Sequence, residues 1–319
     1  MTAPSINPPT PPYLADTTIH EIFREENFTD PTPRPSYPEG LPLTAAQYHQ
    51  LAPALRLASK FLTNSACLPW WTTLILSTPV TDAHTQRAYL PRVASTPETR
   101  ARAQHALRGF ASRVRFRFPK LDFYTRDAYG MSKPVGDAVL ITLHGAHLDH
   151  LKSEAFAAAP ESRRLCFFAH VALTLVHEVA HGVAGLAHGP GAEPFHGVDE
   201  PEAEMGSSWE WFVFNGKMQP LNGMRTAERG LVWWCWVDVQ THFQATLRQD
   251  LRFWGVYMAW VEGLFRELTW RKVEALGMGE MEVRTCGDRA RSCYDREGYW
   301  GEIYRMRRGR GAAVEGEAG

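Results

Sequence analysis

The sequence has few cysteines and no excess of charge of either sign. The five cysteines are an odd number, are widely scattered and form no Cys-x-x-Cys pair. This pattern fits neither a disulfide framework nor a cysteine zinc finger, so we expect reduced thiols. Lysine plus arginine number 34 against 35 for aspartate plus glutamate, a formal net charge of -1. Nucleic acid and anionic membrane surfaces attract basic proteins, and we therefore expect neither as a partner.

The sequence also shows no targeting or membrane segment. Residues 1–16 are proline-rich and contain neither a basic stretch nor an apolar stretch of the kind found in secretory signals. The longest strongly apolar run, 165–176, covers about half of a bilayer span and is followed directly by His-Glu-Val-Ala-His. We therefore predict an intracellular, cytoplasmic protein with no membrane partner.

Composition divides the chain into three parts. Residues 1–40 form a proline-rich arm, which we expect to be largely irregular because proline removes backbone donors and favours extended conformations. Residues 306–319 are short of apolar side chains and are predicted to be a flexible tail. No repeat or linker interrupts the intervening chain, so 41–305 is predicted to be a single domain.

Local patterns predict an α+β fold for this domain. Ser95-Thr96-Pro97-Glu98 resembles a capping box and predicts a helix to Gly109. Period-two alternation predicts a strand over 113–118, and an apolar run between two glycines predicts a buried strand over 137–144. A long buried helix is predicted from Pro160 to His181, weakening at Gly182. Helical stretches predicted over 228–253 and 258–276 make the C-terminal half mainly helical, with a small sheet beside the buried helix.

His177-Glu178-Val179-Ala180-His181 is the motif that carries chemistry. Residues four apart share one face of a helix, so His177 and His181 can bind one zinc ion (Zn2+), with Glu178 beside them. Zinc lowers the pKa of a bound water, and Glu178 would take the proton of that zinc-bound water as it attacks a carbonyl. A helix that buries these three side chains without a partner loses free energy, which favours a metal site over a structural helix.

A catalytic zinc site normally takes three protein ligands, so a third ligand is needed. Asp199 and Glu202 have capping-box spacing, which gives Glu202 a structural role and places Glu200 in the first turn of a helix. Glu204 would then lie one turn further inside, on the same face as Glu200. We predict Glu204 as the third ligand, with Glu200 and Glu202 as alternatives.

The HExxH helix and a glutamate about twenty residues later resemble the zincin metallopeptidases, and within them the gluzincin branch. This resemblance implies a zincin-like metallohydrolase domain and hydrolysis of a peptide or amide substrate. It also implies that an edge strand before the helix binds the substrate backbone, a place in the sequence taken by 137–144. The block from Glu204 to Glu210 is similar to uncharacterised fungal HExxH proteins. The strand motif of gluzincin aminopeptidases is absent.

Several further residues could take part in such a site. His188 resembles the third histidine of the metzincin extension, HExxHxxGxxH, but it comes one residue too late. His170 and Thr174 lie on the ligand face of the helix and are expected to line the cleft. Glu210 or Asp238 could support a ligating histidine. A second metal cluster of His144, His147 and His150 is an alternative to surface or cleft histidines. In zincins a Tyr or His stabilises the oxyanion, and the candidates are His196, His242, Tyr294 and Tyr299.

The sequence therefore predicts a zinc-dependent hydrolase of peptide or amide bonds, a zinc metallopeptidase. Glu178 is the predicted catalytic general base, and His177, His181 and Glu204 are the predicted metal ligands. Two other functions remain open. The chain could be a non-catalytic zinc-binding or interaction protein, or a metal-dependent enzyme acting on a small molecule in a biosynthetic pathway.

Overall fold

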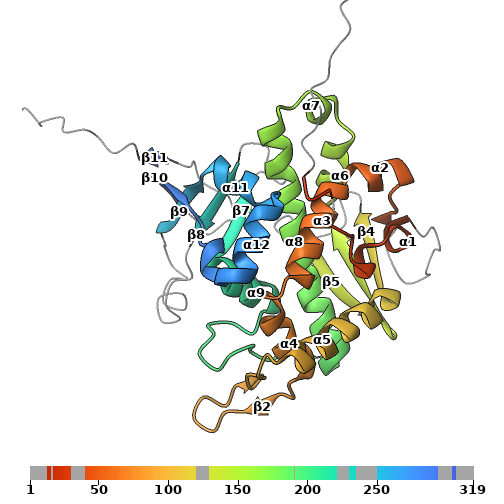
Figure 1. The fold of residues 1–319 in the computed structure, drawn as a ribbon, viewed down its shortest axis with the longest axis vertical. Helices are drawn as coiled ribbons and strands as arrows, with labels where there is room; N and C mark the ends of the chain where they lie inside the picture. Colours follow the sequence, from red (N-terminus) through yellow and green to blue (C-terminus); the bar gives the residue numbers. More distant parts are fainter. Residues whose placement is uncertain are drawn as a thin grey trace, which may run out of the picture.

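The computed structural model describes residues 13–15, 17–29, 40–119, 129–189, 191–220, 230–234, 250–293 and 304–306. Within these residues the chain has a mixed α/β structure, as expected for the α+β class (Figure 1). The helices are η1 (Glu21–Phe23), α1 (Glu25–Thr29), α2 (Ala45–Gln50), α3 (Ala52–Thr63), α4 (Leu68–Leu76), α5 (Pro97–Phe110), η2 (Ala111–Arg113), α6 (Gly145–Leu151), α7 (Glu154–Ala157), α8 (Glu161–His188), α9 (Met205–Phe214), α11 (Met258–Leu264), α12 (Glu267–Leu276) and η4 (Met278–Met281). The strands are β1 (Gly40–Leu41), β2 (Val80–Thr81), β3 (Ala88–Tyr89), β4 (Val114–Pro119), β5 (Gly130–Val135), β6 (Ala138–Leu143), β7 (Lys217–Pro220), β8 (Leu231–Trp234), β9 (Asp250–Val256), β10 (Thr285–Cys293) and β11 (Tyr304–Met306).

Helix α8 runs through the middle of the molecule (Figure 1). Its apolar residues are buried on nearly every side, as the sequence predicts for a core helix. The helix does not weaken at Gly182 but continues to His188. A Cβ at Gly182 would lie 3.1 Å from Val139 Cγ1, so this glycine allows α8 to pack closely on β6. By length and composition α8 could cross a membrane, but 89% of its apolar window is buried inside the structure.

One side of α8 packs against a four-stranded sheet with the order β1-β4-β6-β5. Strands β4 and β6 are parallel, and they confirm the strands predicted over 113–118 and 137–144. The expectation that 137–144 is the edge strand is wrong, because β6 is paired on both sides, with β4 and with β5. The edge strand beside β6 is β5, and a tight turn at Gly136, where φ is +61°, leads from β5 into the antiparallel β6.

A second sheet, with the order β11-β10-β9-β8-β7, lies on the other side of α8 (Figure 1). Its pairs are antiparallel, and β7 is its edge strand next to α9. This sheet corrects the prediction of a helix over 228–253, because 231–234 and 250–256 pair as strands β8 and β9. The helix predicted over 258–276 forms as α11 and α12, with a break between them. Where it is described, the C-terminal half thus combines helices α8, α9, α11 and α12 with a five-stranded sheet that the sequence did not predict.

Residues 17–29, which the composition assigns to the irregular arm, contain the two helices η1 and α1. Ile22, Phe23 and Phe28 are fully buried in the core, and the Phe28 ring stacks on Phe116 with centroids 4.3 Å apart. The packed structure therefore begins earlier than the predicted boundary at residue 41. The predicted helix to Gly109 is confirmed as α5, although its N-cap is Thr96 rather than Ser95.

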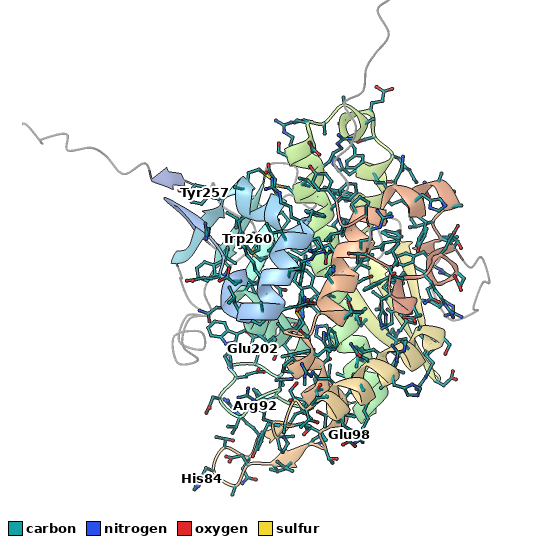
Figure 2. The ribbon with its side chains drawn as sticks, viewed as in Figure 1. His84, Arg92, Glu98, Glu202, Tyr257 and Trp260 are labelled. Carbon is teal, nitrogen blue, oxygen red and sulfur yellow. The ribbon has the colours of Figure 1, made fainter. Side chains whose placement is uncertain are left out.

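A small hairpin, β2–β3, projects from one end of the molecule, with His84 at its exposed tip (Figure 2). Phe195 joins this hairpin through an isolated β-bridge: Phe195 N donates to Ala88 O at 2.8 Å, and Leu90 N donates to Phe195 O at 2.8 Å. The hairpin thus binds the segment that follows α8, far away in the sequence.

Candidate metal centre and cleft

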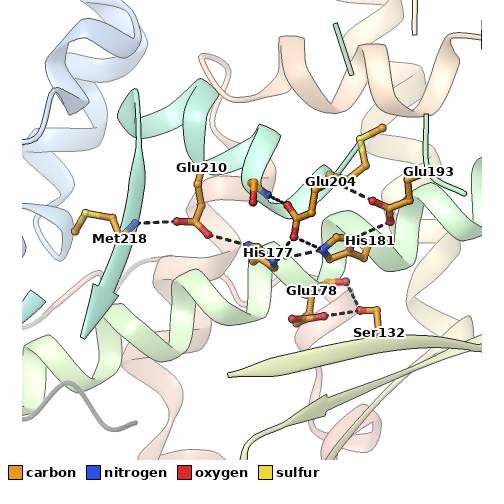
Figure 3. A network of polar contacts seen from close by, with 10 residues as sticks. Ser132, His177, Glu178, His181, Glu193, Glu204, Glu210 and Met218 are labelled. Carbon is orange, nitrogen blue, oxygen red and sulfur yellow. Dashed lines mark hydrogen bonds and ion pairs between the residues drawn. The ribbon is translucent and has the colours of Figure 1, made fainter. Parts of the chain in front are cut away.

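Three side chains of metal-ligating type converge on the face of α8 that carries the HExxH motif. The Nε2 atoms of His177 and His181 lie 3.3 Å apart. Glu204 Oε1 lies 3.1 Å from His177 Nε2 and 3.0 Å from His181 Nε2 (Figure 3). Among the residues that the structure describes, this is the only group of three or more such side chains whose ligand atoms lie within 4.8 Å of one another. These three residues could therefore hold one metal ion.

Glu204 reaches the imidazoles from the N-cap of α9. Its Oε2 atom accepts a hydrogen bond from Ser207 N, which satisfies one free N–H of the helix start, and its Oε1 atom faces the two histidines. The predicted helix start at Asp199 is wrong, because residues 199–203 form turns and bends and α9 begins only at Met205. The sequence thus leads to Glu204, but this residue caps the helix instead of lying one turn inside it.

Glu210 orients the first of the two imidazoles. His177 Nδ1 donates to Glu210 Oε1 at 2.8 Å, and Glu210 Oε2 accepts from Met218 N of β7 at 2.9 Å. A histidine that gives its Nδ1–H to a carboxylate presents Nε2 to a metal, and the carboxylate fixes the plane of the ring. Glu210 is one of the two residues that the sequence suggests for this role. The other, Asp238, lies outside the described residues.

Glu193 orients the second imidazole, and the sequence gives no indication of it. His181 Nδ1 donates to Glu193 Oε1 at 2.7 Å, and Glu193 Oε2 accepts from Met205 N at 2.9 Å (Figure 3). Both histidines are therefore held in the same way, by a carboxylate whose second oxygen binds a backbone N–H of another element.

Glu178 lies on the side of α8 that faces β5. Its side chain is buried, with 5% of the residue exposed. The Ser132 hydroxyl can donate to two oxygens of Glu178, the backbone carbonyl at 2.6 Å and Oε2 at 3.0 Å. A Cβ at Gly130 would lie 2.6 Å from Glu178 Cγ, so only glycine leaves room for this side chain. Strand β5 thus holds the carboxylate that the sequence identifies as a general base.

A second glycine gives His177 its space. A Cβ at Gly206, in the first turn of α9, would lie 2.3 Å from His177 Nε2 and 2.4 Å from His177 Cε1. Non-bonded carbon atoms prefer separations of about 3.5–4.0 Å, so no other residue fits at Gly206 without moving the ring. Neither Gly130 nor Gly206 could be identified from the sequence, because each is required by a contact with α8, which is distant in the sequence.

The carboxylates around the two histidines favour positive charge on the imidazoles, as the direction of each pKa shift shows. Burial lowers the pKa of His177, but the Glu204 and Glu210 carboxylates outweigh burial and hold the His177 pKa well above its ordinary value. The pKa of His181 is raised to about 9, because Glu193 and Glu204 outweigh the effect of burial. Burial raises the pKa of Glu204, but the two histidines outweigh it and hold the Glu204 pKa well below its usual range. Burial raises the pKa of Glu178.

His177, Glu178, His181 and Glu204 line a cleft of about 670 Å³. Residues 129–134 of β5 and its approach line one side, and residues 217–219 of β7 line another. His170 and Thr174 line the cleft, as the sequence predicts. The volume lies within the range of about 300–1,000 Å³ that is typical of ligand pockets.

The alternative ligands are directed elsewhere. Glu200 Oε1 accepts from the Ser208 hydroxyl at 2.6 Å, and burial raises the pKa of Glu200 to about 7. Glu202 lies on the loop before α9 (Figure 2). His188 Nε2 donates to Leu74 O at 2.7 Å. None of these three residues belongs to the converging group. The chain does not bend at Gly185 to bring His188 back to the metal site, as the metzincin pattern would require, because α8 continues as a helix to His188.

The remaining histidines do not form a second metal group among the described residues. His144, His147 and His150 are buried, which corrects the expectation of surface or cleft positions. His196 stacks on Trp70 with centroids 4.7 Å apart and does not line the cleft, so it is not placed to stabilise an oxyanion. The other three candidates for that role, His242, Tyr294 and Tyr299, lie outside the described residues.

Comparison of the chain with protein-family models, with curated proteins and with solved structures gave no significant match. The assignment of a function therefore depends on the geometry of the site and on the chemistry of its residues.

Proposed function

We propose that the protein is a zinc-dependent hydrolase of peptide or amide bonds, with His177, His181 and Glu204 as zinc ligands and Glu178 as general base. The observation that carries this proposal is the convergence of the three ligand atoms in the lining of a cleft that also contains the buried carboxylate of Glu178. Helix α8 beside the edge strand β5 supports the resemblance to zincins that the HExxH motif suggests.

The donor set fits zinc. Two imidazole nitrogens and one carboxylate oxygen are common ligands of catalytic zinc, which leaves one position for water or substrate. Ligand atoms about 2.0–2.1 Å from a tetrahedral ion lie about 3.3 Å from one another. The three separations in this site, 3.0, 3.1 and 3.3 Å, are close to that value. Glu193 and Glu210 supply the carboxylate partners that ligating histidines commonly have.

In the proposed mechanism Glu178 carries the proton. A bound zinc ion supplies a Lewis acid that polarises the substrate carbonyl and acidifies water. Glu178 accepts a proton from the attacking water while the new C–O bond forms, and returns a proton to the amide nitrogen as the C–N bond breaks. Burial raises the pKa of Glu178, which makes its carboxylate a stronger base. Ser132 and Gly130 keep the carboxylate in place for both transfers.

Strand β5 is an edge strand of its sheet in the part of the chain that the structure describes, and this favours an extended peptide as the substrate. Tyr129 O accepts from His144 N at 2.8 Å, so the backbone groups of Tyr129 face β6. Backbone groups alternate in direction along an antiparallel strand, so those of Gly130 and Ser132 point away from β6. Pro134 is compatible with an edge strand, which is one of the few places where a sheet accepts proline. A substrate strand can therefore pair with Gly130 and Ser132 beside Glu178.

The second edge strand near the cleft is less suited to bind a peptide. Met218 N of β7 already donates to Glu210, and Pro220 has no N–H. Of the two edge strands, β5 is therefore the better candidate for substrate binding.

The proposal is tested by zinc content and by peptide turnover in the same samples. Wild type should bind one zinc per chain by elemental analysis, Glu204→Ala should lose it, and Glu200→Ala, the matched control, should keep it. Glu178→Gln should keep zinc and lose turnover of a peptide library. A wild type that binds no zinc would refute the proposal. Bound zinc without turnover of any peptide would favour the two alternatives, a non-catalytic zinc protein or an enzyme of small-molecule metabolism.

A further inference from the structure

We propose that one end of the cleft is a pocket for a large apolar side chain of the substrate, and that this pocket sets the cleavage preference. We call it the Gly185 pocket and define it by six residues that line the cleft, Pro79, Ala88, Ala184, Gly185, Ala192 and Pro194. This inference rests on the proposed function and deepens it, because it names the class of peptide that the enzyme cleaves.

The Gly185 pocket lies one helical turn beyond the metal centre. Gly185 follows His181 by four residues on α8, and both residues line the cleft. Residues four apart share one face of a helix and are separated by about 6 Å along its axis. An extended peptide advances about 3.4 Å per residue. A side chain in the pocket therefore belongs to one of the two residues next to the scissile bond, on one side of that bond.

Gly185 leaves an open volume that the packing of the protein does not require. A Cβ at Gly185 would meet nothing within 4 Å, whereas a Cβ at Gly182 would lie 3.1 Å from Val139 Cγ1. Glycine in the interior of a helix is less stable than alanine, so the missing side chain at Gly185 lowers stability. Gly185 is half-buried and lines the cleft, so the open volume beside it is part of the cleft. The pocket thus has room for a side chain that comes from a ligand.

Apolar residues from three segments form the walls of the pocket. Pro79 directly precedes β2, Ala88 is on β3, and Ala184 is on α8. Ala192 and Pro194 come from the loop after α8. These side chains contain no polar atom. A polar side chain placed between them would lose its contact with water without a hydrogen bond in exchange, whereas an apolar side chain gains free energy from the same burial.

The polar side chains beside the pocket already have partners. Both carboxylate oxygens of Glu193 accept hydrogen bonds, as described above. His188 Nε2 donates to Leu74 O at 2.7 Å. The two lysines that line the cleft, Lys133 and Lys217, are on β5 and β7 and not on the pocket walls. The surroundings therefore favour an apolar side chain over an acidic or basic one.

Contacts between the loop and the hairpin form the pocket before a substrate binds. Phe195 joins the two segments through its two backbone hydrogen bonds of 2.8 Å. The Arg87 guanidinium lies 4.7 Å from the centre of the Phe195 ring, and Arg87 Nη1 donates to Glu200 O at 3.1 Å. These contacts hold Ala88 and Pro194 in place as two walls of the pocket. A preformed pocket loses little entropy on binding, so apolar burial appears directly as preference for a substrate.

Turnover of a peptide panel by zinc-loaded wild type tests the inference. The two residues on each side of the cleaved bond are varied in turn among Ala, Leu, Phe, Asp and Lys. At one of these positions, kcat/KM should be at least about tenfold higher with Leu or Phe than with Ala, Asp or Lys.

Substitutions of Gly185 test whether this pocket is the cause. In Gly185→Leu the added side chain fills the pocket, so the preference at that position should fall below about twofold. Gly185→Ala should show an intermediate preference. Gly109→Leu is the matched control, because Gly109 is an exposed glycine of α5 whose Cβ would also meet nothing within 4 Å. It should keep the wild-type preference.

A binding measurement gives the same answer without turnover. In zinc-loaded Glu178→Gln, the Kd of the preferred Leu or Phe peptide should be at least about tenfold lower than that of the matching Ala peptide. Adding Gly185→Leu to this variant should remove the difference. Equal Kd values for the two peptides in Glu178→Gln would overturn the inference.

The outcomes separate the inference from the proposed function. If wild type cleaves peptides but prefers Leu or Phe at none of the four positions, the inference is wrong and the proposed function stands. A preference that Gly185→Leu leaves intact also overturns the inference. If wild type binds no zinc or cleaves no peptide of the panel, the proposed function and the inference fail together. The wild-type comparison requires no variant to fold.

Discussion

Replacing Gly206 by alanine should abolish tight metal binding. The added Cβ would lie 2.3–2.4 Å from three ring atoms of His177, and carbon atoms prefer at least about 3.5 Å, so the ring or the start of α9 must move by more than about 1 Å. His177 Nδ1 is bound to Glu210 Oε1 at 2.8 Å, and a displacement of that size breaks the hydrogen bond.

The expected loss is large because two effects combine. Loss of a carboxylate partner alone typically weakens metal binding about 10- to 100-fold, and in Gly206→Ala the ligand atom itself also moves. We therefore expect zinc affinity to fall by more than about 100-fold, measured by competition with a chelator of known affinity.

Two other glycine substitutions provide controls in the same chain. A Cβ at Gly185, in the interior of α8, would meet nothing within 4 Å, so Gly185→Ala should keep zinc and raise the free energy of unfolding by about 0.5–1 kcal/mol. Gly130→Ala would clash with Glu178 Cγ, so it should keep zinc and lose turnover. If Gly206→Ala binds zinc as tightly as Gly185→Ala, the position of His177 in the proposed site is wrong.

Three further predictions concern the site and the core. Glu210→Gln should weaken zinc binding about 10- to 100-fold at unchanged stoichiometry, measured by chelator competition, because the amide holds His177 less firmly; unchanged affinity would contradict this role. His20 accepts a hydrogen bond from Ile22 N, and burial lowers its pKa from 6.5 to about 4. The His20 imidazole therefore takes up a proton at a higher pH in the unfolded chain than in the folded chain. As the pH falls from 6.5 to 4, the free energy of unfolding of wild type should fall by up to about 3 kcal/mol relative to His20→Asn, measured by urea unfolding. Parallel pH profiles of the two proteins would contradict this prediction. Phe116→Ala should lower the free energy of unfolding by about 3–5 kcal/mol in the same assay, because it removes a fully buried ring that stacks on Phe28, and a loss below about 1 kcal/mol would show that the core is not packed in this way.

The parts of the site that depend on local geometry could be predicted from the sequence. His177, Glu178 and His181 lie on one helix, whose period fixes their relation before any tertiary contact is known. Strands β4 and β6 were also predictable, because alternation or an apolar run between glycines marks each of them.

The parts that depend on contacts between distant segments could not be predicted. Glu204 is near the two histidines, but the helix that was expected to carry it starts later than its acidic residues suggest. Glu193 has no motif, because its role depends on the path of a loop that pairs with the hairpin β2–β3. Strand β5 contains a proline and a lysine and shows no clear alternation. The tryptophan-rich run at β8 falls within the helix predicted over 228–253, but aromatic residues also favour strands.

The hydrogen bond from Met218 to Glu210 has a consequence for how the protein can be shortened or assembled. All three proposed ligands precede residue 205, so a fragment ending there would contain the complete ligand set. Such a fragment would lack Glu210 and β7, the strand whose backbone holds the Glu210 carboxylate against His177. During synthesis, the ligands therefore leave the ribosome before the residues that orient them. High metal affinity should arise only after Met218 has emerged and β7 has docked beside α9.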